Sequence, residues 1–161
     1  MRTDPNCIFC KIVAGAIPCF KLYEDQATLA FMDINPANQG HALAIAKEHW
    51  QDLYEIPPEL LGAVAKTAQR VAAAVKKTVE PDGINLAQAN GPGAGQSVFH
   101  FHIHVLPRLT GDELKLNWGH TPGAPSGAPS LRDAQEGGQP AGRPGDMAAV
   151  TAVYERIKAN M

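Results

Sequence analysis

The sequence predicts an α+β fold with five strand-like runs, one long helix, and a shorter helix towards each end of the chain. Three observations lead to this prediction. Histidines and apolar residues alternate strictly from Phe99 to Val105, apolar residues recur at helical spacing between Ile56 and Val79, and turn residues separate four further strand-like runs. With 161 residues, of which 45% are hydrophobic and 19% charged, the chain is expected to form one globular domain.

Each element follows from a local pattern. Apolar residues from Ile8 to Val13 give a short helical face, which Gly15 and Pro18 end. The first two strand-like runs are joined by a three-residue turn, which suits an antiparallel hairpin. Prolines open the long helix, whose small residues favour packing on a sheet. The five predicted strands are Phe20 to Glu24, Thr28 to Ile34, Gly40 to Lys47, Gly83 to Asn90 and Val98 to Leu106.

Composition divides the chain into three parts, of which residues 1–118 hold the predicted sheet and its helices. Residues 119–145 contain seven glycines and five prolines but one large apolar side chain, Leu131. Such a segment cannot bury enough apolar surface to offset its ordering entropy, so we expect a mobile loop. Residues 146–161 predict a final helix, from Asp146 to Asn160, that packs on its own domain or on a partner subunit.

The overall charge restricts the class of partner. A formal net charge of -2 leaves no basic field, which argues against a nucleic-acid polymer but leaves a single nucleotide open. The sequence has no run of eighteen apolar residues, and its start lacks the apolar core of a signal peptide. We therefore expect a cytoplasmic protein that does not engage a membrane.

His100, His102 and His104 give the strongest functional signal. Successive strand side chains point to opposite faces, so the three imidazoles are expected on one face, about 6.6 Å apart along the strand. That spacing suits a shared anion, such as a phosphate, or a metal ion. Three of the six histidines fall within five residues, so a chance set of core histidines explains the pattern poorly.

Two features beside the histidines allow two interpretations each. The glycine-rich connection from Gly91 to Ser97 suits a flexible hairpin loop. Its position favours a concavity of backbone N–H groups that binds an anion, with Gln96 and Ser97 donating to phosphoryl oxygens. The spacing of Asp33 favours a turn cap, and the alternative is a carboxylate that accepts hydrogen bonds from ribose hydroxyls.

Cys7 and Cys10 form a C-x-x-C pair, and Cys19 makes the cysteine count odd. A redox pair is expected near a βαβ pattern, whereas consecutive strands follow this one, so redox chemistry is disfavoured. Zinc needs about four nitrogen or sulfur ligands, and His49 and His100 are the candidates for the other two. Cys19 matches no motif and is expected to be a packing residue.

These motifs together resemble the histidine triad family of nucleotide hydrolases and transferases. The family signature matches the run His100-Phe-His102-Ile-His104-Val-Leu. The other matching stretches are Cys7-Ile-Phe-Cys10-Lys-Ile, Ala30-Phe-Met-Asp33-Ile-Asn-Pro36, Gly40-His41 and Gly95-Gln96-Ser97. The resemblance covers about residues 4 to 118, and residues 119–145 have no counterpart in it. It implies a five-stranded antiparallel sheet with two helices, and a homodimer formed through the long helix and a strand.

The resemblance also implies roles for individual residues. His102 would attack the α-phosphorus of a nucleoside phosphoramidate, dinucleoside polyphosphate or acyl-adenylate, and water would then release the nucleotide from the imidazole. His104 and Ser97 would stabilise phosphoryl charge or assist the leaving group. The residues implied to bind a purine nucleotide are Asp33 at the ribose, Ile8, Phe9, Ile12, Phe31 and Ile34 at the base, and Asn90, Gln96 and His41 near the phosphates.

Zinc enters through the same resemblance. In members with an N-terminal C-x-x-C, the ligands resemble Cys7, Cys10, His49 and His100, and four ligands would make a structural Zn²⁺ site, so the chemistry itself would need no cofactor. Two alternatives to a nucleotidyl hydrolase stay open. One is a nucleotide-binding interaction protein with weak or vestigial catalysis, and the other is a metal-dependent hydrolase whose catalytic metal the three histidines hold.

Overall fold

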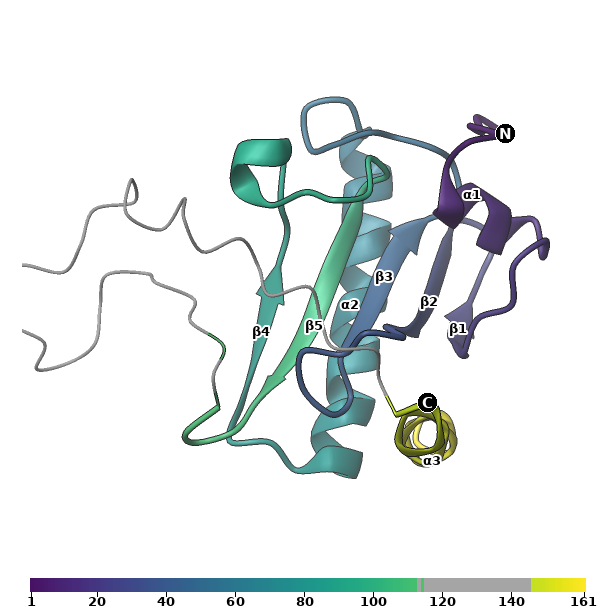
Figure 1. Cartoon of the computed structure of the whole chain (residues 1–161). Coiled ribbons are helices and arrows are strands. Elements are labelled where there is room, and N and C mark those ends of the chain that lie inside the picture. The colour runs from purple at the N-terminus through teal and green to yellow at the C-terminus, as the bar shows by residue number, and fades with distance from the viewer. Residues whose placement is uncertain (113, 115–145) are drawn as a thin grey trace, which may run out of the picture.

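Five antiparallel strands form one sheet in the order β1-β2-β3-β5-β4 (Figure 1). The computed structural model describes residues 1–112, 114 and 146–161, so the mobile loop predicted at 119–145 lies outside the described residues. The strands are β1 (Lys21–Glu24), β2 (Thr28–Met32), β3 (Ala42–Ala46), β4 (Gly83–Ala87) and β5 (His102–Arg108). The predicted α+β class and the antiparallel sheet are confirmed.

The long helix α2 (Pro58–Val79) covers one face of this sheet. Its apolar stripe, which includes Val64, Ala68 and Val71, packs in one core with side chains from β3 and β5. Proline suits the first helical position because the amide it lacks would have no partner inside the helix. The predicted helix is therefore confirmed, and its burial against the central strands fixes the position of β5.

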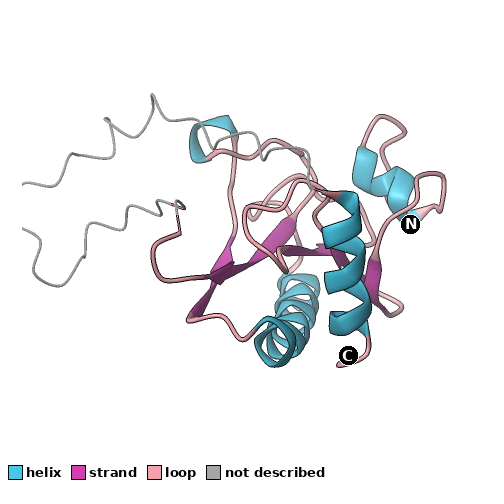
Figure 2. Ribbon diagram, turned by 60° about the horizontal axis from the view of Figure 1, so that its bottom comes forward, coloured by secondary structure: helices cyan, strands magenta, loops and turns pink. Residues whose placement is uncertain are grey.

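The final helix α3 (Met147–Lys158) lies beside α2 on the same face of the sheet and on its own chain (Figure 2). The carboxylate of Asp146 caps its start by accepting from two backbone N–H groups. Near its end, Lys158 Nζ donates to the Leu22 carbonyl oxygen at 2.7 Å. In this structure α3 packs on its own domain, which is one of the two arrangements that the sequence left open. None of the helices within the described residues is long and apolar enough to span a bilayer.

The short helix α1 (Ile8–Val13) packs on the opposite face of the sheet. There it joins a second buried cluster, which consists of Cys7, Phe9, Cys10, Leu29, Phe31, Leu43 and Ile45. All residues of β2 and β3 are consequently buried. Strands covered on both faces carry nearly continuous apolar runs, which explains why these two lack a clear alternation in the sequence.

β5 begins at His102, four residues later than the sequence pattern predicts. The Phe101 N–H donates to the carbonyl oxygen of Trp50, in the loop after β3, at 2.6 Å. The His100 N–H donates to the Val98 carbonyl oxygen at 2.9 Å, which makes a turn instead of a sheet contact. The prediction that all three histidines lie on one strand is therefore wrong for His100, which precedes the strand.

Gly40→Ala is expected to destabilise the fold. Gly40 has a φ of +89°, and a Cβ there would lie 3.0 Å from Val79 Cγ2 and 3.3 Å from Pro107 Cγ. Backbone strain and overpacking together should cost roughly 2–4 kcal/mol, or about 5–15 °C in the midpoint of thermal unfolding followed by circular dichroism. Gly62→Ala in α2 is the matched control, since a Cβ there meets nothing within 4 Å and alanine favours a helix. Equal midpoints for the two variants would contradict this packing.

Candidate functional site

His102 lies at the start of β5 and is 3% exposed. Its Nδ1 lies 2.6 Å from the backbone carbonyl oxygen of His100. A carbonyl oxygen only accepts, so Nδ1 carries the proton and Nε2 keeps its lone pair. Burial lowers the pKa of His102 below its usual value, so the imidazole is neutral at pH 7. A neutral imidazole fixed in this tautomer is suited to act as a nucleophile.

His104 and His41 lie beside His102. The ring centroids of His102 and His104 are 4.8 Å apart, and His41 Nε2 lies 2.9 Å from His104 Nδ1. Burial, followed by the charge that His102 would carry when protonated, lowers the pKa of His41 to about 4 and that of His104 to about 3. Both rings are therefore neutral at physiological pH, so each carries one N–H donor and no full positive charge.

Asp33 forms the turn cap that its spacing predicts. Its Oδ1 accepts from the Asn35 N–H at 2.8 Å, which is an Asx turn. Its Oδ2 lies 3.5 Å from His41 Nδ1, and burial raises the pKa of the carboxyl group. The Asp33 side chain therefore lies beside His41. Its binding of a ribose, which the resemblance implies, stays a prediction.

Cys7, Cys10, His49 and His100 converge on the α1 side of the sheet, with one potential ligand atom from each lying within 4.8 Å of the others. Cys7 Sγ and Cys10 Sγ lie 3.4 and 3.6 Å from His100 Nδ1, and Cys10 Sγ lies 3.4 Å from His49 Nδ1. Sulfur and nitrogen ligands of a tetrahedral zinc ion stand about 3.5 Å apart, as follows from Zn–S and Zn–N bonds of about 2.3 and 2.0 Å. The donor set and its spacing thus fit zinc.

His100 connects this cluster to His102. Its Nε2 lies 2.8 Å from the Ala46 carbonyl oxygen, so Nε2 carries the proton and Nδ1 directs its lone pair at the two sulfur atoms. Its own carbonyl oxygen holds His102 Nδ1. The Phe9 ring, between the two cysteines, contacts the rings of His100 and His102 with centroids 5.7 and 5.4 Å apart. The Cys/His cluster and the candidate nucleophile therefore share a residue and a packing partner.

Gln96 closes the glycine-rich loop, which contains the short 3-10 helix η1 (Pro92–Ala94). The Gln96 Oε1 accepts from the Gly91 N–H at 2.7 Å, and its Nε2 donates to the Gln51 carbonyl oxygen at 2.7 Å. The Gln96 backbone N–H donates to the Gly91 carbonyl oxygen. With these groups engaged, the geometry does not support direct donation by Gln96 to a phosphate. Ser97, which follows, is exposed.

Asn90 also has protein partners. Its Oδ1 accepts from the Leu53 N–H at 2.8 Å, and its amide pairs with that of Gln88. The side chain thus holds the loop before α2 against the start of the glycine-rich loop. These contacts do not test the prediction that Asn90 lies near the phosphates.

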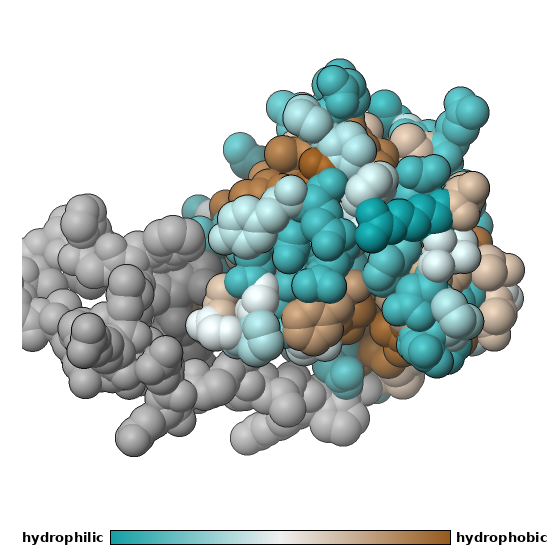
Figure 3. Space-filling model, turned by 90° about the horizontal axis from the view of Figure 1, so that it is seen from above, coloured by the Kyte–Doolittle hydropathy of each residue, from teal (hydrophilic) through white to brown (hydrophobic). Residues whose placement is uncertain are grey.

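Phe9, Ile12 and Phe31, three of the five apolar residues predicted for a base pocket, pack in the cluster on the α1 side of the sheet. The Phe9 ring contacts those of Phe31 and His102, whereas Ile8 and Ile34 are 45% and 53% exposed. The view of the molecule from above shows apolar surface in patches among polar groups (Figure 3). The base pocket implied by the resemblance stays a prediction.

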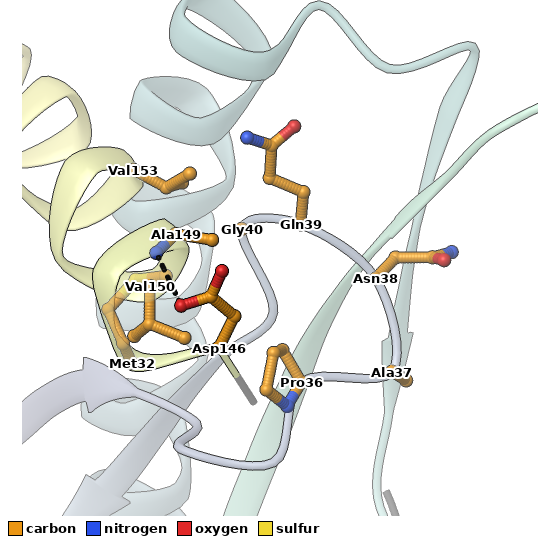
Figure 4. Close-up of a pocket in the computed structure, with 10 residues that line it drawn as sticks. All are labelled: Met32, Pro36, Ala37, Asn38, Gln39, Gly40, Asp146, Ala149, Val150 and Val153. Carbon is orange, nitrogen blue, oxygen red and sulfur yellow. Dashed lines mark hydrogen bonds between the residues drawn. The ribbon is translucent and has the colours of Figure 1, made fainter. Parts of the chain in front are cut away.

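A separate cavity of about 320 Å³ opens on the α2 side, between the turn at residues 36–40 and α3 (Figure 4). Its walls are mainly apolar, and Asp146, the one ionisable residue among them, caps α3 through the Ala149 N–H. This cavity holds none of the histidines. His102 and His104 pair with Ile45 and Leu43 of β3, whose side chains lie on the other face of the sheet.

The buried histidines predict a fold that loses stability as the pH falls. Their folded pKa values lie below 6.5, so the unfolded chain binds more protons, and the stability present above pH 6.5 declines towards the folded values near 4 and 3. Each excluded proton contributes about 1.4 kcal/mol per pH unit. Urea unfolding at equal zinc content should therefore show a slope between pH 6.5 and 5 that is about 1.4 kcal/mol per pH unit smaller for His41→Phe. Identical slopes would contradict the burial of a neutral His41.

Known proteins match this chain over most of its described part. Residues 14–111 match the family model of the HIT domain. A Bacillus subtilis protein named protein hit is 44% identical over 119 residues, which are 73% of this chain and 82% of that protein. An adenosine 5'-monophosphoramidase of Schizosaccharomyces pombe is 40% identical over 74% of this chain and 88% of its own length. An Arabidopsis thaliana adenylylsulfatase is 43% identical over 68% of this chain and 55% of its own length.

The fold matches as well. A zinc-bound histidine triad family protein from Mycobacterium smegmatis superposes with a TM-score of 0.70 at 32% identity, and the match covers 96% of this chain and 94% of that structure. The matched residues 14–111 include the triad run from His100 to His104 and all five strands, whereas Cys7 and Cys10 precede them. The chain belongs to the histidine triad (HIT) family.

Proposed function

We propose that this protein is a nucleotidyl hydrolase, which cleaves a P–N or P–O–P bond of a purine nucleotide through a covalent nucleotidyl-His102 intermediate and releases a nucleoside monophosphate. The observation that carries the proposal is the 2.6 Å contact between His102 Nδ1 and the His100 carbonyl oxygen. It fixes the lone pair on Nε2 of a buried, neutral imidazole, as in-line attack on phosphorus requires.

The reaction is two displacements at the α-phosphorus. In the first, His102 Nε2 forms a bond to phosphorus, the bond to the leaving nitrogen or oxygen breaks, and the leaving group takes a proton from solvent through the Ser97 hydroxyl while neutral His104 donates a hydrogen bond to it. In the second, a water oxygen attacks phosphorus, the bond to Nε2 breaks, and the proton that the water loses returns to solvent through the same hydroxyl. In this proposal the backbone N–H of Ser97, at the end of the glycine-rich loop, stabilises the phosphoryl oxygens.

The names of the relatives support an adenylyl group as the transferred unit. Adenosine 5'-monophosphoramidase and adenylylsulfatase name substrates that share adenylyl and differ in the group attached to phosphorus. A site that holds the nucleoside and the phosphate accommodates both leaving groups, because the covalent intermediate is the same. In this proposal Asp33 binds the ribose, and Ile8, Phe9, Ile12, Phe31 and Ile34 contact the base.

The zinc site has a structural role in this proposal. Cys7, Cys10, His49 and His100 would hold Zn²⁺ with four protein ligands, which would leave no position for substrate. Zinc bound there would anchor α1 to the segment that precedes β5. His100 keeps its carbonyl oxygen on His102 Nδ1, and the displacements use only protein groups and water.

A homodimer remains part of the proposal. β4 lies at one edge of the sheet, and Leu86 on that strand is 50% exposed. An exposed edge strand with an apolar side chain is a surface that a second copy can cover. Light scattering on the purified protein is expected to give twice the mass of one chain, and a single-chain mass at micromolar concentration would rule the dimer out.

Product analysis tests the proposed function. Adenosine phosphoramidate, a diadenosine polyphosphate and adenylyl sulfate are each expected to yield AMP, with the zinc content measured on the same sample. We expect turnover to continue when metal ions are removed from the buffer, because the nucleophile is His102 and not a metal-bound water. Binding of AMP without turnover of any member of the panel would favour the interaction-protein alternative.

A further inference from the structure

His41 is held more tightly than a phosphate contact requires. Its backbone N–H donates to the Asn38 carbonyl oxygen at 3.0 Å, and its own carbonyl oxygen accepts from the Asp33 N–H at 3.0 Å. Its side chain is buried, with both ring nitrogens in contact with protein: Nδ1 lies 3.2 Å from the Ala37 backbone nitrogen, and Nε2 lies 2.9 Å from His104 Nδ1. The second of these contacts reaches a residue of the triad.

The contact with Ala37 decides where the protons lie. A backbone N–H only donates, so His41 Nδ1 accepts from Ala37 and carries no proton. A neutral imidazole has one N–H, which is then at Nε2 and donates to His104 Nδ1. His104 Nδ1 therefore accepts, and the proton of neutral His104 is at Nε2.

Asp33 offers the competing arrangement. Its Oδ2 lies 3.5 Å from His41 Nδ1, so a proton on Nδ1 would form an ion pair or hydrogen bond with this carboxylate. That arrangement would leave the Ala37 N–H without its acceptor and require a longer contact than the 3.2 Å one. Burial also favours neutral His41. The Ala37 contact therefore prevails.

We propose that His41 is a positioning residue, which fixes His104 as the Nε2–H tautomer so that His104 presents a hydrogen-bond donor to the phosphoryl oxygens or the leaving group. The catalytic consequence rests on the proposed function, whereas the position of the proton does not. In the opposite tautomer, His104 would turn a lone pair towards the anion. His41 thus acts on the reaction through His104, and Ala37 acts through His41.

Three substitutions separate positioning from packing. His41→Gln keeps an amide N–H that reaches His104, His41→Asn keeps an acceptor for Ala37 but is too short to reach His104, and His41→Phe fills the site without either hydrogen bond. With adenosine phosphoramidate, His41→Asn and His41→Phe are expected to lower kcat by roughly 10–100-fold with KM little changed. His41→Gln is expected to stay within about tenfold of the unsubstituted protein.

Long-range proton–nitrogen NMR correlations of the histidine rings report the tautomer directly, with His104→Ala as the assignment control. The unsubstituted protein is expected to show His104 protonated at Nε2, and His41→Phe a shift of the population towards Nδ1. Protonation of His104 at Nδ1 in the unsubstituted protein would overturn the inference. So would a His41→Phe variant in which both the His104 tautomer and kcat are the same as in the unsubstituted protein. An Nε2 tautomer in a protein that turns over no substrate would sustain the assignment of the proton and refute the proposed function.

Discussion

His102→Ala is expected to abolish turnover, lowering kcat for adenosine phosphoramidate by about 10⁴-fold or more. The reason is that the variant lacks the nitrogen that forms the bond to phosphorus. AMP binding should survive, because Asp33 and the apolar residues that are proposed to contact the nucleoside are unchanged. Steady-state kinetics with calorimetric AMP binding checks both expectations.

Chemical rescue separates loss of a nucleophile from a general disturbance of the site. His102→Gly leaves a space where the ring stood, and free imidazole is expected to restore part of the turnover in a concentration-dependent way. A general disturbance would not respond to imidazole. Undiminished turnover by His102→Ala would exclude His102 as the nucleophile.

Cys7→Ser and Cys10→Ser are expected to cost the protein its zinc and at least about 3 kcal/mol of stability, which is about 10 °C in the unfolding midpoint. Each substitution removes a thiolate from a set of donors whose spacing fits the ion. Because His100 also holds His102, kcat should fall as zinc is lost. Metal analysis and thermal unfolding of the same samples provide the measurement.

Cys19→Ser is the matched control for these variants. Cys19 lies outside the Cys/His cluster and is partly exposed, so its substitution should leave the zinc content unchanged and shift the midpoint by a few degrees at most. The zinc assignment would be contradicted if Cys7→Ser behaved like Cys19→Ser, or if the unsubstituted protein contained no zinc.

Local patterns predicted the elements whose formation depends on local residues. The apolar spacing between Ile56 and Val79 gave α2 nearly to the residue, and the two runs around Asp25 gave the β1–β2 hairpin. The start of β5 could not be found this way, because it depends on a hydrogen bond from Phe101 to Trp50, which lies fifty-one residues earlier in the sequence. The sequence likewise could not predict that α3 packs on α2, because this packing depends on contacts between residues far apart in the chain.

The site divides in the same way. The residue types and their spacing marked His102, His104, Cys7 and Cys10 as candidate site residues. In the structure the rings of His102 and His104 are neighbours, and the two cysteines lie beside His49 and His100. The sequence could not predict the backbone groups that orient the rings: the carbonyl oxygens of His100 and Ala46 and the N–H of Ala37. Backbone groups are the same at every position, so no residue pattern marks them.

The central claim is that His102 becomes covalently bound to the nucleotide. The most direct test is to mix the protein with adenosine phosphoramidate, stop the reaction in alkali within milliseconds to seconds, and measure the mass of the protein and its peptides. The expected result is a transient gain of one adenylyl group on the peptide that contains His102, absent in His102→Ala. Turnover without any covalent species at any time, or with the adenylyl group on another residue, would contradict the mechanism.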